Sequence, residues 1–507
     1  MSRRQASEPC PRRTGPAVPD RSPGSDSSDR RRLGPAVTVP RRPSRPPRPG
    51  PPRGRSGPPR PPVDDPPRRV ALDALAAVRE RDAYANLVLP GLLRQRGING
   101  RDAALATELC YGTCRAQGLL DAVLQSCVDR PLPEVDGELL DALRLGSYQL
   151  LRTRVPPHAA VATTVDLVRA GRGSAAAGFV NAVLRRVGEQ DEDGWVAAVA
   201  PAADDDPVGH LAMAHSHPRW IAQAFADALG GDLDELADAL AADDARPLVH
   251  LVARPGQISA AELAELTGGR VASYSPCGVH LADGGDPGEL IPIRDRLAHV
   301  QDEGSQLVTL GLASVPLEGS DTRWLDLCAG PGGKAALLGA LGATRGSMVD
   351  AVEKSEHRAR LVSQACAGLP VTVHVVDGRD SGLPERCYDR VLVDAPCTGL
   401  GALRRRPEAR WRRQADDLAG LVRLQRELLI AALRVVRSGG VVAYVTCSPH
   451  LDETVGVVAD VVRRTGAAQL DARPRFPGVP RLGDGPYVQL WPHRHGTDAM
   501  FCALLRR

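Results

Sequence analysis

The chain has 507 residues, of which 43% are apolar and 25% are charged, and its formal net charge is +3. This length predicts two or three domains. The sequence contains no run of about 18 apolar residues, so we expect no membrane span and no membrane partner. The eleven cysteines show no repeated Cys-x-x-Cys spacing, which argues against a metal site and favours a reduced, cytoplasmic chain.

Residues 1–67 differ in composition from the rest of the chain. They contain 19 of the 44 prolines, and their 15 arginines against 6 acidic residues give a net charge of +9 (15 − 6). A segment so rich in proline and so poor in large apolar residues cannot fill a core, so we predict a disordered tail. Two hypotheses stay open for this tail: non-specific binding of RNA phosphates, or a dispensable extension.

Residues 68–203 have the periodicity of helices. Apolar side chains at positions 71, 74, 75 and 78 share one helix face, and similar patterns cover residues 103–117, 137–152, 158–170 and 175–188. The acidic run 204–206 before Pro207 indicates a linker. Residues 204–300 then mix helices with a strand over 248–252, where we expect His215, His217 and His250 to be cap or core residues.

A glycine loop follows a predicted strand at residues 324–327. The loop covers residues 328–334 and leads into a helix rich in alanine and leucine. A P-loop requires glycine where Cys328 stands and serine or threonine where Ala335 stands. A dinucleotide fingerprint requires a third glycine, again at Ala335. The remaining nucleotide interpretation is S-adenosylmethionine, whose methionine end carries no phosphate.

Three further predicted strands end at an acidic residue. The strands are 348–352, 371–376 and 390–393, and the acids are Glu353, Asp377 and Asp394. In an open α/β sheet the carboxyl ends of parallel strands share the edge at which ligands bind, and an acid about 20 residues past the loop can bind ribose hydroxyls. The alternative for each acid taken singly is a helix N-cap.

Two cysteines extend this pattern. Cys397 follows the strand at 390–393, and Cys447 follows an apolar run at 440–443, so both are expected at the same edge. Only two of the 64 basic residues are lysines, Lys334 and Lys354, which leaves 62 arginines (64 − 2). A lysine kept inside the glycine loop suggests a need for a compact ammonium, whereas Lys354 has no such setting.

In combination, these motifs resemble the Sun/Fmu family of bacterial RNA 5-methylcytosine methyltransferases. The resemblance rests on residues 300–306, 326–334, 377–379, 394–399, 404–411 and 446–448, and residues 108–112, 145–151 and 178–186 resemble NusB. Two stretches depart from the family pattern: residues 452–454, usually Glu-Glu-Asn, and 499–501, usually Gly-Phe-Phe.

The resemblance implies a multidomain fold. An all-α NusB-like RNA-binding domain is expected at 68–203, after the tail at 1–67. Linker helices and a small α+β RNA-recognition-like subdomain are expected at 204–300. An α/β, Rossmann-like class I methyltransferase domain dependent on S-adenosylmethionine is expected at 301–507.

The resemblance also implies the roles of site residues. Cys447 would be the nucleophile, Cys397 would complete product release, and Asp394 would bind the base near N3 and N4. Residue logic alone does not choose between the cysteines, because DNA cytosine methyltransferases use the Pro-Cys cysteine. The donor would contact Asp394 and Cys328, Ala329, Gly330, Pro331, Gly332, Gly333, Lys334, Glu353 (ribose) and Asp377 (adenine).

The expected substrate is a cytosine of 16S ribosomal RNA, modified before the small subunit is fully assembled, by a monomeric enzyme. The alternatives are another RNA (transfer RNA or 23S ribosomal RNA) or a vestigial RNA-binding assembly factor. An amino-group methyltransferase is a further alternative, but such enzymes typically carry Asn/Asp-Pro-Pro-Tyr/Phe where this chain has Asp-Ala-Pro-Cys at 394–397. Arg404, Arg405, Arg406, Arg410 and Trp411 are predicted to hold or stack on RNA, with a solvated helix face as the alternative.

Overall fold

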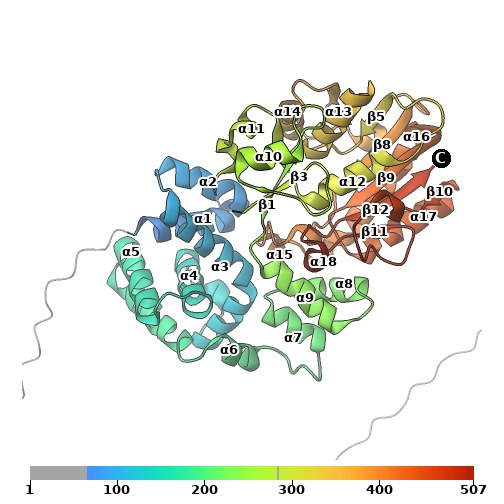
Figure 1. Ribbon diagram of the computed structural model, residues 1–507. Coiled ribbons are helices and arrows are strands. Elements are labelled where there is room, and N and C mark those ends of the chain that lie inside the picture. The colour runs from blue at the N-terminus through green and yellow to red at the C-terminus, as the bar shows by residue number, and fades with distance from the viewer. Residues whose placement is uncertain (1–64, 283–284) are drawn as a thin grey trace, which may run out of the picture. The chain divides into compact units, whose positions relative to one another are not determined.

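The computed structural model describes residues 65–282 and 285–507 (Figure 1). The tail predicted at 1–67 therefore lies outside the described residues, except for its last three. Asp65 is the N-cap of α1 (Pro66–Arg81), and its side chain accepts a hydrogen bond from the Arg68 backbone N–H. Prolines 66 and 67 fit this first turn because a helix needs no backbone donors there.

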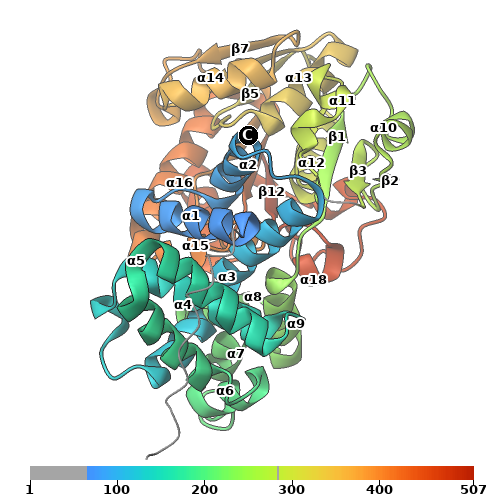
Figure 2. The same ribbon diagram turned by 90° about the vertical axis from the view of Figure 1, so that its left-hand side faces the viewer.

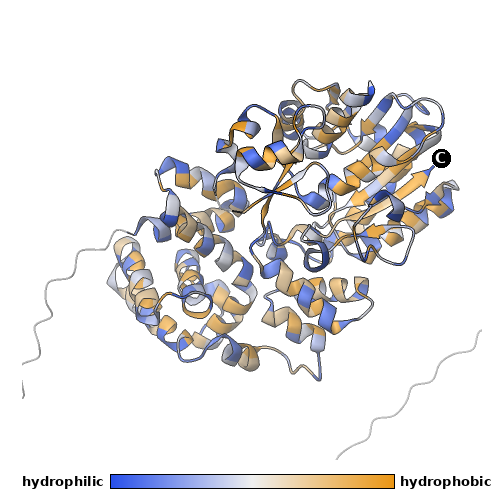
Figure 3. Ribbon diagram, viewed as in Figure 1, coloured by the Kyte–Doolittle hydropathy of each residue, from blue (hydrophilic) through white to orange (hydrophobic). Residues whose placement is uncertain are grey.

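Helices make up the N-terminal part. They are α1, α2 (Ala85–Gln95), α3 (Gly100–Cys127), α4 (Gly137–Arg152), α5 (Pro157–Val187) and α6 (Glu192–Val199). The break predicted between the helices at 158–170 and 175–188 is confirmed, because Gly173 within α5 has a non-helical backbone with a φ of +82°. Apolar residues such as Leu109, Leu120 and Leu145 are fully buried between the helices. Figure 3 shows that apolar and polar residues alternate along these helices, as expected for helices that bury one face.

Three short helices follow: α7 (Pro207–Ala214), α8 (Arg219–Ala228) and α9 (Leu233–Asp244). Their apolar faces share one cluster with Leu400, Leu403 and Trp491 from the C-terminal part of the chain. The predicted linker is thus packed on the catalytic part through a common core.

The small subdomain has a split βαβ architecture. Its elements are β1 (Val249–Ala253), α10 (Ala260–Thr267), β2 (Arg270–Val271), β3 (Gly278–Leu281), α11 (Ile291–Arg294) and β4 (Ala298–Val300). The four strands are antiparallel in the order β2-β3-β1-β4. This βαββαβ arrangement confirms the predicted α+β subdomain.

A mixed sheet forms the C-terminal part, with strand order β10-β12-β9-β8-β5-β6-β7 and β11 paired to β12 (Figures 1 and 2). Its strands are β5 (Arg323–Asp326), β6 (Met348–Val352), β7 (Val371–His374), β8 (Tyr388–Asp394), β9 (Val436–Thr446), β10 (Ala468–Leu470), β11 (Val488–Gln489) and β12 (Phe501–Arg506). Its helices are α12 (Glu303–Ser314), α13 (Gly333–Arg345), α14 (Glu356–Ala365), α15 (Ala409–Arg412), α16 (Asp417–Val435), α17 (Val455–Thr465) and α18 (Pro492–His495).

Strands β7, β6, β5, β8 and β9 are parallel, and β12 is antiparallel to β9. Val391, Val393 and Val442 are fully buried, as expected for parallel strands covered on both faces. The chain leaves β5 toward β6 and later returns to β8 on the other side. This reversal of strand order places the ends of β5 and β8 at the switch point, where such sheets bind ligands.

No helix in the described ranges is both long and apolar enough to cross a membrane.

Candidate active site

The glycine loop connects β5 to α13 and packs against the end of β6. Gly332 has a φ of +115°, which side-chain-bearing residues rarely adopt, and it is the N-cap of α13. A Cβ at Gly330 would stand 2.1 Å from Glu353 Oε2. The backbone conformation favours glycine at position 332, and a side chain at position 330 would displace the Glu353 carboxylate that lies beside the loop.

Lys334, the last loop residue, reaches the end of β8. Its Nζ lies 2.8 Å from Asp394 Oδ2, and the side chain is almost completely buried. Burial alone would lower the pKa of this ammonium, but the Asp394 carboxylate raises it above its ordinary value. The loop thus carries a permanent positive charge at the switch point.

Asp326, at the end of β5, is a site residue that we did not predict to have a role of its own. It is completely buried; its Oδ1 accepts a hydrogen bond from the Cys328 backbone N–H at 3.3 Å, and its Oδ2 has no partner. Burial, reinforced by the charge of Asp394, raises its pKa to about 7. A carboxyl group this perturbed is typical of functional sites.

The two cysteines meet at the ends of β8 and β9, with Sγ atoms 3.5 Å apart. Their hydrogen bond is the largest cause that lowers the pKa of Cys447 and raises the pKa of Cys397. For Cys447, burial and the Asp394 carboxylate oppose this shift, and the Lys334 ammonium adds to it. For Cys397, burial and the Glu453 carboxylate raise the pKa further. These surroundings favour the thiolate of Cys447 over that of Cys397.

Glu453 fixes the turn that follows Cys397. It is completely buried and accepts hydrogen bonds from the Thr398 backbone N–H (2.8 Å), the Thr398 hydroxyl and Gln425 Nε2 (2.9 Å). The hydroxyl of Tyr444, on β9, donates to the Glu453 backbone carbonyl. Sequence reasoning placed residues 452–454 outside the chemistry; in the fold, Glu453 ties the two cysteine segments together.

Glu353 directly follows the last residue of β6, and Asp377 lies three residues beyond the end of β7. Glu353 accepts a hydrogen bond from the Ser355 backbone N–H at 2.8 Å. Asp377 contacts Arg379 (2.8 Å) and Lys354 (3.1 Å), and hydrogen bonds from Arg379 in particular hold its pKa well below the usual range. Lys354 lies outside the glycine loop, as the sequence shows, and its exposed ammonium pairs with Asp377.

This edge fits S-adenosylmethionine. The cradle at Gly330 and Gly332 leaves no room for a Cβ, and it faces Glu353 at the next strand end. The uncharged loop at 328–333 suits a donor without phosphates. Among the described residues, no group of three His, Cys, Asp or Glu side chains is arranged to hold a metal ion.

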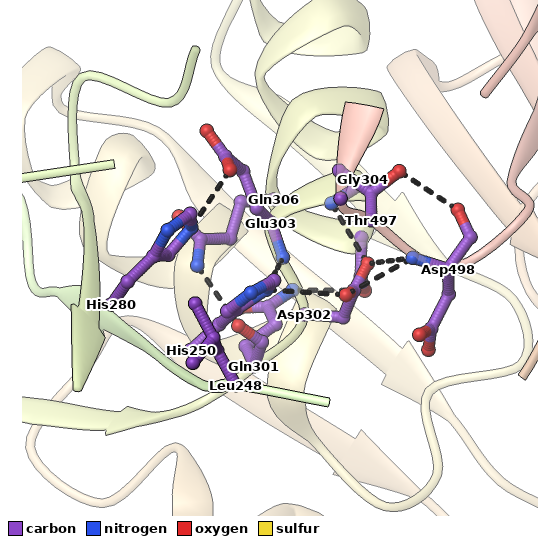
Figure 4. Close-up of polar contacts among 12 residues, drawn as sticks. Leu248, His250, His280, Gln301, Asp302, Glu303, Gly304, Gln306, Thr497 and Asp498 are labelled. Atoms are coloured by element: carbon purple, nitrogen blue, oxygen red, sulfur yellow. Dashed lines mark hydrogen bonds and ion pairs between the residues drawn. The ribbon is translucent and has the colours of Figure 1, made fainter. Parts of the chain in front are cut away.

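Of the arginines among residues 404–410, Arg406 is exposed, whereas the other three are wholly or partly buried. Arg404 and Arg405 both pair with Asp302 and Asp498 at 2.8–3.2 Å. Figure 4 shows Asp302 between Asp498 and His250 of the small subdomain. His250 is buried there, as predicted for a core residue.

Farther along, this segment reaches the N-terminal helices. Arg410 has no exposed surface; it pairs with Asp244 at 2.8 Å and donates to the backbone carbonyls of Arg115 and Asp243. Arg406 lies over the Tyr84 ring, and Trp411 packs against Gly118. The prediction that these side chains hold RNA is wrong for Arg404, Arg405 and Arg410, because intramolecular acids and carbonyls occupy their donors.

The sequence matches two family descriptions: "16S rRNA methyltransferase RsmB/F" over residues 315–506 and "NusB family" over residues 65–189. Rv1407 of Mycobacterium tuberculosis, named as a methyltransferase, is 62% identical over 457 residues, which cover 90% of this chain and 99% of the relative.

Two other relatives are named ribosomal RNA small subunit methyltransferase B, the first with the qualifier "probable". The Bacillus subtilis protein is 30% identical and the Pseudomonas putida protein is 34% identical. The matches cover 87% and 80% of this chain, and 98% and 91% of the relatives. The crystal structure of PH0851 superposes with a TM-score of 0.73 at 22% identity, covering 88% of this chain and 99% of that chain, which establishes the shared fold.

Proposed function

Because the chain belongs to the RsmB/F family of 16S rRNA methyltransferases, which transfer methyl groups from S-adenosylmethionine to RNA, we propose that its acceptor atom is C5 of a cytosine in 16S rRNA. We propose further that the reaction passes through a covalent bond between Cys447 Sγ and C6 of that base. The observation that carries this proposal is the cysteine pair, 3.5 Å apart, in which the hydrogen bond between the thiols lowers the pKa of Cys447.

Cytosine C5 is a poor nucleophile until a thiolate adds to C6. In the proposal, the Cys447 thiolate forms the S–C6 bond, and C5 then carries enamine-like electron density. Asp394 accepts a hydrogen bond from the base near N4, and Lys334 beside it places positive charge where the ring becomes electron-rich. Once C5 carries the transferred methyl group, a base accepts the C5 proton. The C5–H electron pair then forms the C5–C6 double bond, and the S–C6 bond breaks to release the Cys447 thiolate.

Cys397 is suited to the release step rather than to attack. It keeps its proton near Cys447, because its hydrogen bond to that thiol and its burial, with the Glu453 carboxylate, raise its pKa, so it is able to protonate the departing thiolate. Glu453 holds the backbone N–H of Thr398, the next residue, and so fixes where this thiol stands. Loss of Cys397 would then leave an adduct that forms but resolves poorly.

When bound, S-adenosylmethionine supplies the electrophilic methyl group. The loop residues 328–333 would surround its methionine end, with Glu353 on the ribose and Asp377 near the adenine. Glu353 is 7% exposed and already anchored by Ser355, so its carboxylate is preorganised. With a pKa of about 7, the carboxyl of Asp326 is only partly ionised near neutral pH.

The proposed substrate is small-subunit rRNA before the subunit is fully assembled, since the target base must leave its stack to reach the cysteines. The names of the Bacillus and Pseudomonas relatives and the NusB match support this choice. We also propose a monomeric enzyme in a reducing, cytoplasmic compartment, because two neighbouring active-site thiols would otherwise form a disulfide. The tail at 1–67 and the domains at 68–203, 204–300 and 301–507 remain predictions.

Bisulfite sequencing of 16S rRNA tests the acceptor atom. RNA from a strain that lacks this protein should lose one protected cytosine, and the wild-type gene should restore it. A gene carrying Cys447→Ser should not restore protection. If protection in 16S rRNA is the same with and without the protein, the proposed substrate is wrong.

A further inference from the structure

A cavity of about 590 Å³ lies at the junction of the small subdomain and the catalytic sheet, beside the glycine loop. The small subdomain contributes Arg254, Arg296 and His299 to its wall. The catalytic part contributes Pro331 from the loop, and Gln364 and Ala365 from the end of α14. The cavity therefore touches the donor loop from the side of the subdomain expected to recognise RNA.

The wall of this cavity is cationic. In the part of the chain that the structure describes, no lining residue is acidic, and neither Arg254 nor Arg296 forms an ion pair. Burial, with the charge of Arg296, lowers the pKa of Arg254, and burial together with Arg254 lowers the pKa of His299 to about 4. Arg254 and Arg296 repel each other, and His299 is neutral near pH 7, so the two arginines give the cavity a net positive potential.

Among these groups, Arg254 is the one whose burial carries the largest unfavourable free energy of desolvation. The residue is only 5% exposed; one guanidinium nitrogen donates to the Ala365 carbonyl at 2.7 Å, while Nε has no hydrogen-bond partner. A buried guanidinium with a carbonyl but no counter-charge pays a desolvation penalty that nothing in its described surroundings repays. An anion in the cavity would supply that charge.

We propose that this cavity binds a backbone phosphodiester of the RNA substrate and thereby positions the strand beside the donor loop. Arg254 and Arg296 match this group because guanidinium forks bind phosphate oxygens, and the two arginines come from the subdomain opposite the catalytic edge. Cationic contacts to the RNA must come from residues other than Arg404, Arg405 and Arg410, because these three already form internal ion pairs. The inference rests on the proposed RNA substrate.

Binding of a 16S rRNA transcript over a series of salt concentrations tests this site. Arg296 is exposed, and its side chain forms no hydrogen bond or ion pair among the described residues. We expect Arg296→Gln to lower the slope of log K against log salt by about 0.7–0.9, the contribution of one phosphate contact. At about 0.1 M salt this slope change corresponds to a roughly five- to eightfold weaker affinity. Arg254→Gln should act in the same direction, and calorimetry with S-adenosylmethionine should verify that each variant is folded.

Arg386→Gln is the matched control, because Arg386 is exposed and precedes β8 at the opposite edge of the sheet. It should leave both slope and affinity unchanged. If Arg296→Gln also matches wild type while the wild type methylates the transcript, this inference is wrong and the proposed function stands. A wild type that neither binds nor methylates the transcript would contradict the proposed function instead. If inorganic phosphate raises the Tm of wild type but not of Arg296→Gln, and RNA binding is the same in both, the site takes a free anion and not RNA.

Discussion

Replacing Arg410 with methionine tests how residues 404–412 join the parts of this protein. The guanidinium is completely buried between the N-terminal helices, the α9 end and the catalytic part. Methionine would keep the volume but leave the Asp244 carboxylate, 2.8 Å away, without its closest cation. The carbonyls of Arg115 and Asp243 would lose their donors as well.

We expect a large loss of folding stability, because the Asp244 carboxylate would remain buried without the guanidinium that pairs with it. Such a change costs about 3–5 kcal/mol, far more than the pair itself contributes. Arg410 lowers the pKa of Asp244 against the opposing effect of burial, which shows how strongly this carboxylate depends on its neighbour. The double variant Arg410→Met/Asp244→Asn should therefore be more stable than the sum of the single changes by about 0.5–3 kcal/mol.

Urea unfolding of the full chain, followed by circular dichroism, measures these differences. Arg413→Met serves as the control, because no hydrogen bond or ion pair of the Arg413 side chain is seen among the described residues; it should change stability by no more than about 0.5 kcal/mol. A loss below about 1 kcal/mol for Arg410→Met would refute the view that this arginine joins the parts.

Three other changes have defined outcomes. Asp326→Asn should make the free energy of unfolding less dependent on pH. The folded carboxyl holds its proton up to about pH 7, whereas the unfolded one releases it near 3.8, so wild type loses up to about 4 kcal/mol of stability as the pH rises between these values. Equal pH profiles of the two proteins in thermal unfolding would contradict the raised pKa of Asp326. Glu353→Ala should weaken S-adenosylmethionine binding by roughly 10- to 150-fold in calorimetry, since a charged hydrogen bond contributes about 1.5–3 kcal/mol, whereas exposed Glu356→Ala should not. Deleting residues 1–60 should leave the Tm unchanged and weaken RNA binding mainly at low salt, and a large drop in Tm would refute a dispensable tail.

Sequence patterns predicted the sheet edge well, because a strand followed by a glycine or acid has a local signal. Glu353, Asp394 and both cysteines therefore lie where strand-end logic places them, although β7 ends at His374 before its predicted limit. The choice between the cysteines came from the family resemblance and stays a prediction, to which the fold adds physical support. Folding brings the two thiols within hydrogen-bond distance, with Lys334 near one and Glu453 near the other, although these residues are 113 and 56 positions away from Cys447 and Cys397 (447 − 334; 453 − 397).

The arginine segment shows the opposite case. A run of arginines beside a tryptophan has the composition of an RNA-binding surface, and no local pattern reveals that Asp244, Asp302 and Asp498 are its partners. Asp326 was equally hidden, since its raised pKa comes from burial under a loop and from Asp394 on another strand. Burial and long-range pairing are properties of the assembled core, so they appear only once the chain is folded.

The central claim is that Cys447 attacks the base while Cys397 serves release, and a denaturing gel with labelled 16S rRNA tests it most directly. With S-adenosylmethionine present, Cys397→Ala should accumulate a denaturant-resistant protein–RNA adduct. Cys447→Ala should form no adduct and no methylated product, and Cys328→Ala should still form the adduct. The reverse behaviour of the Cys397 and Cys447 variants would show that Cys397 is the nucleophile, and full activity in both would contradict the thiolate mechanism.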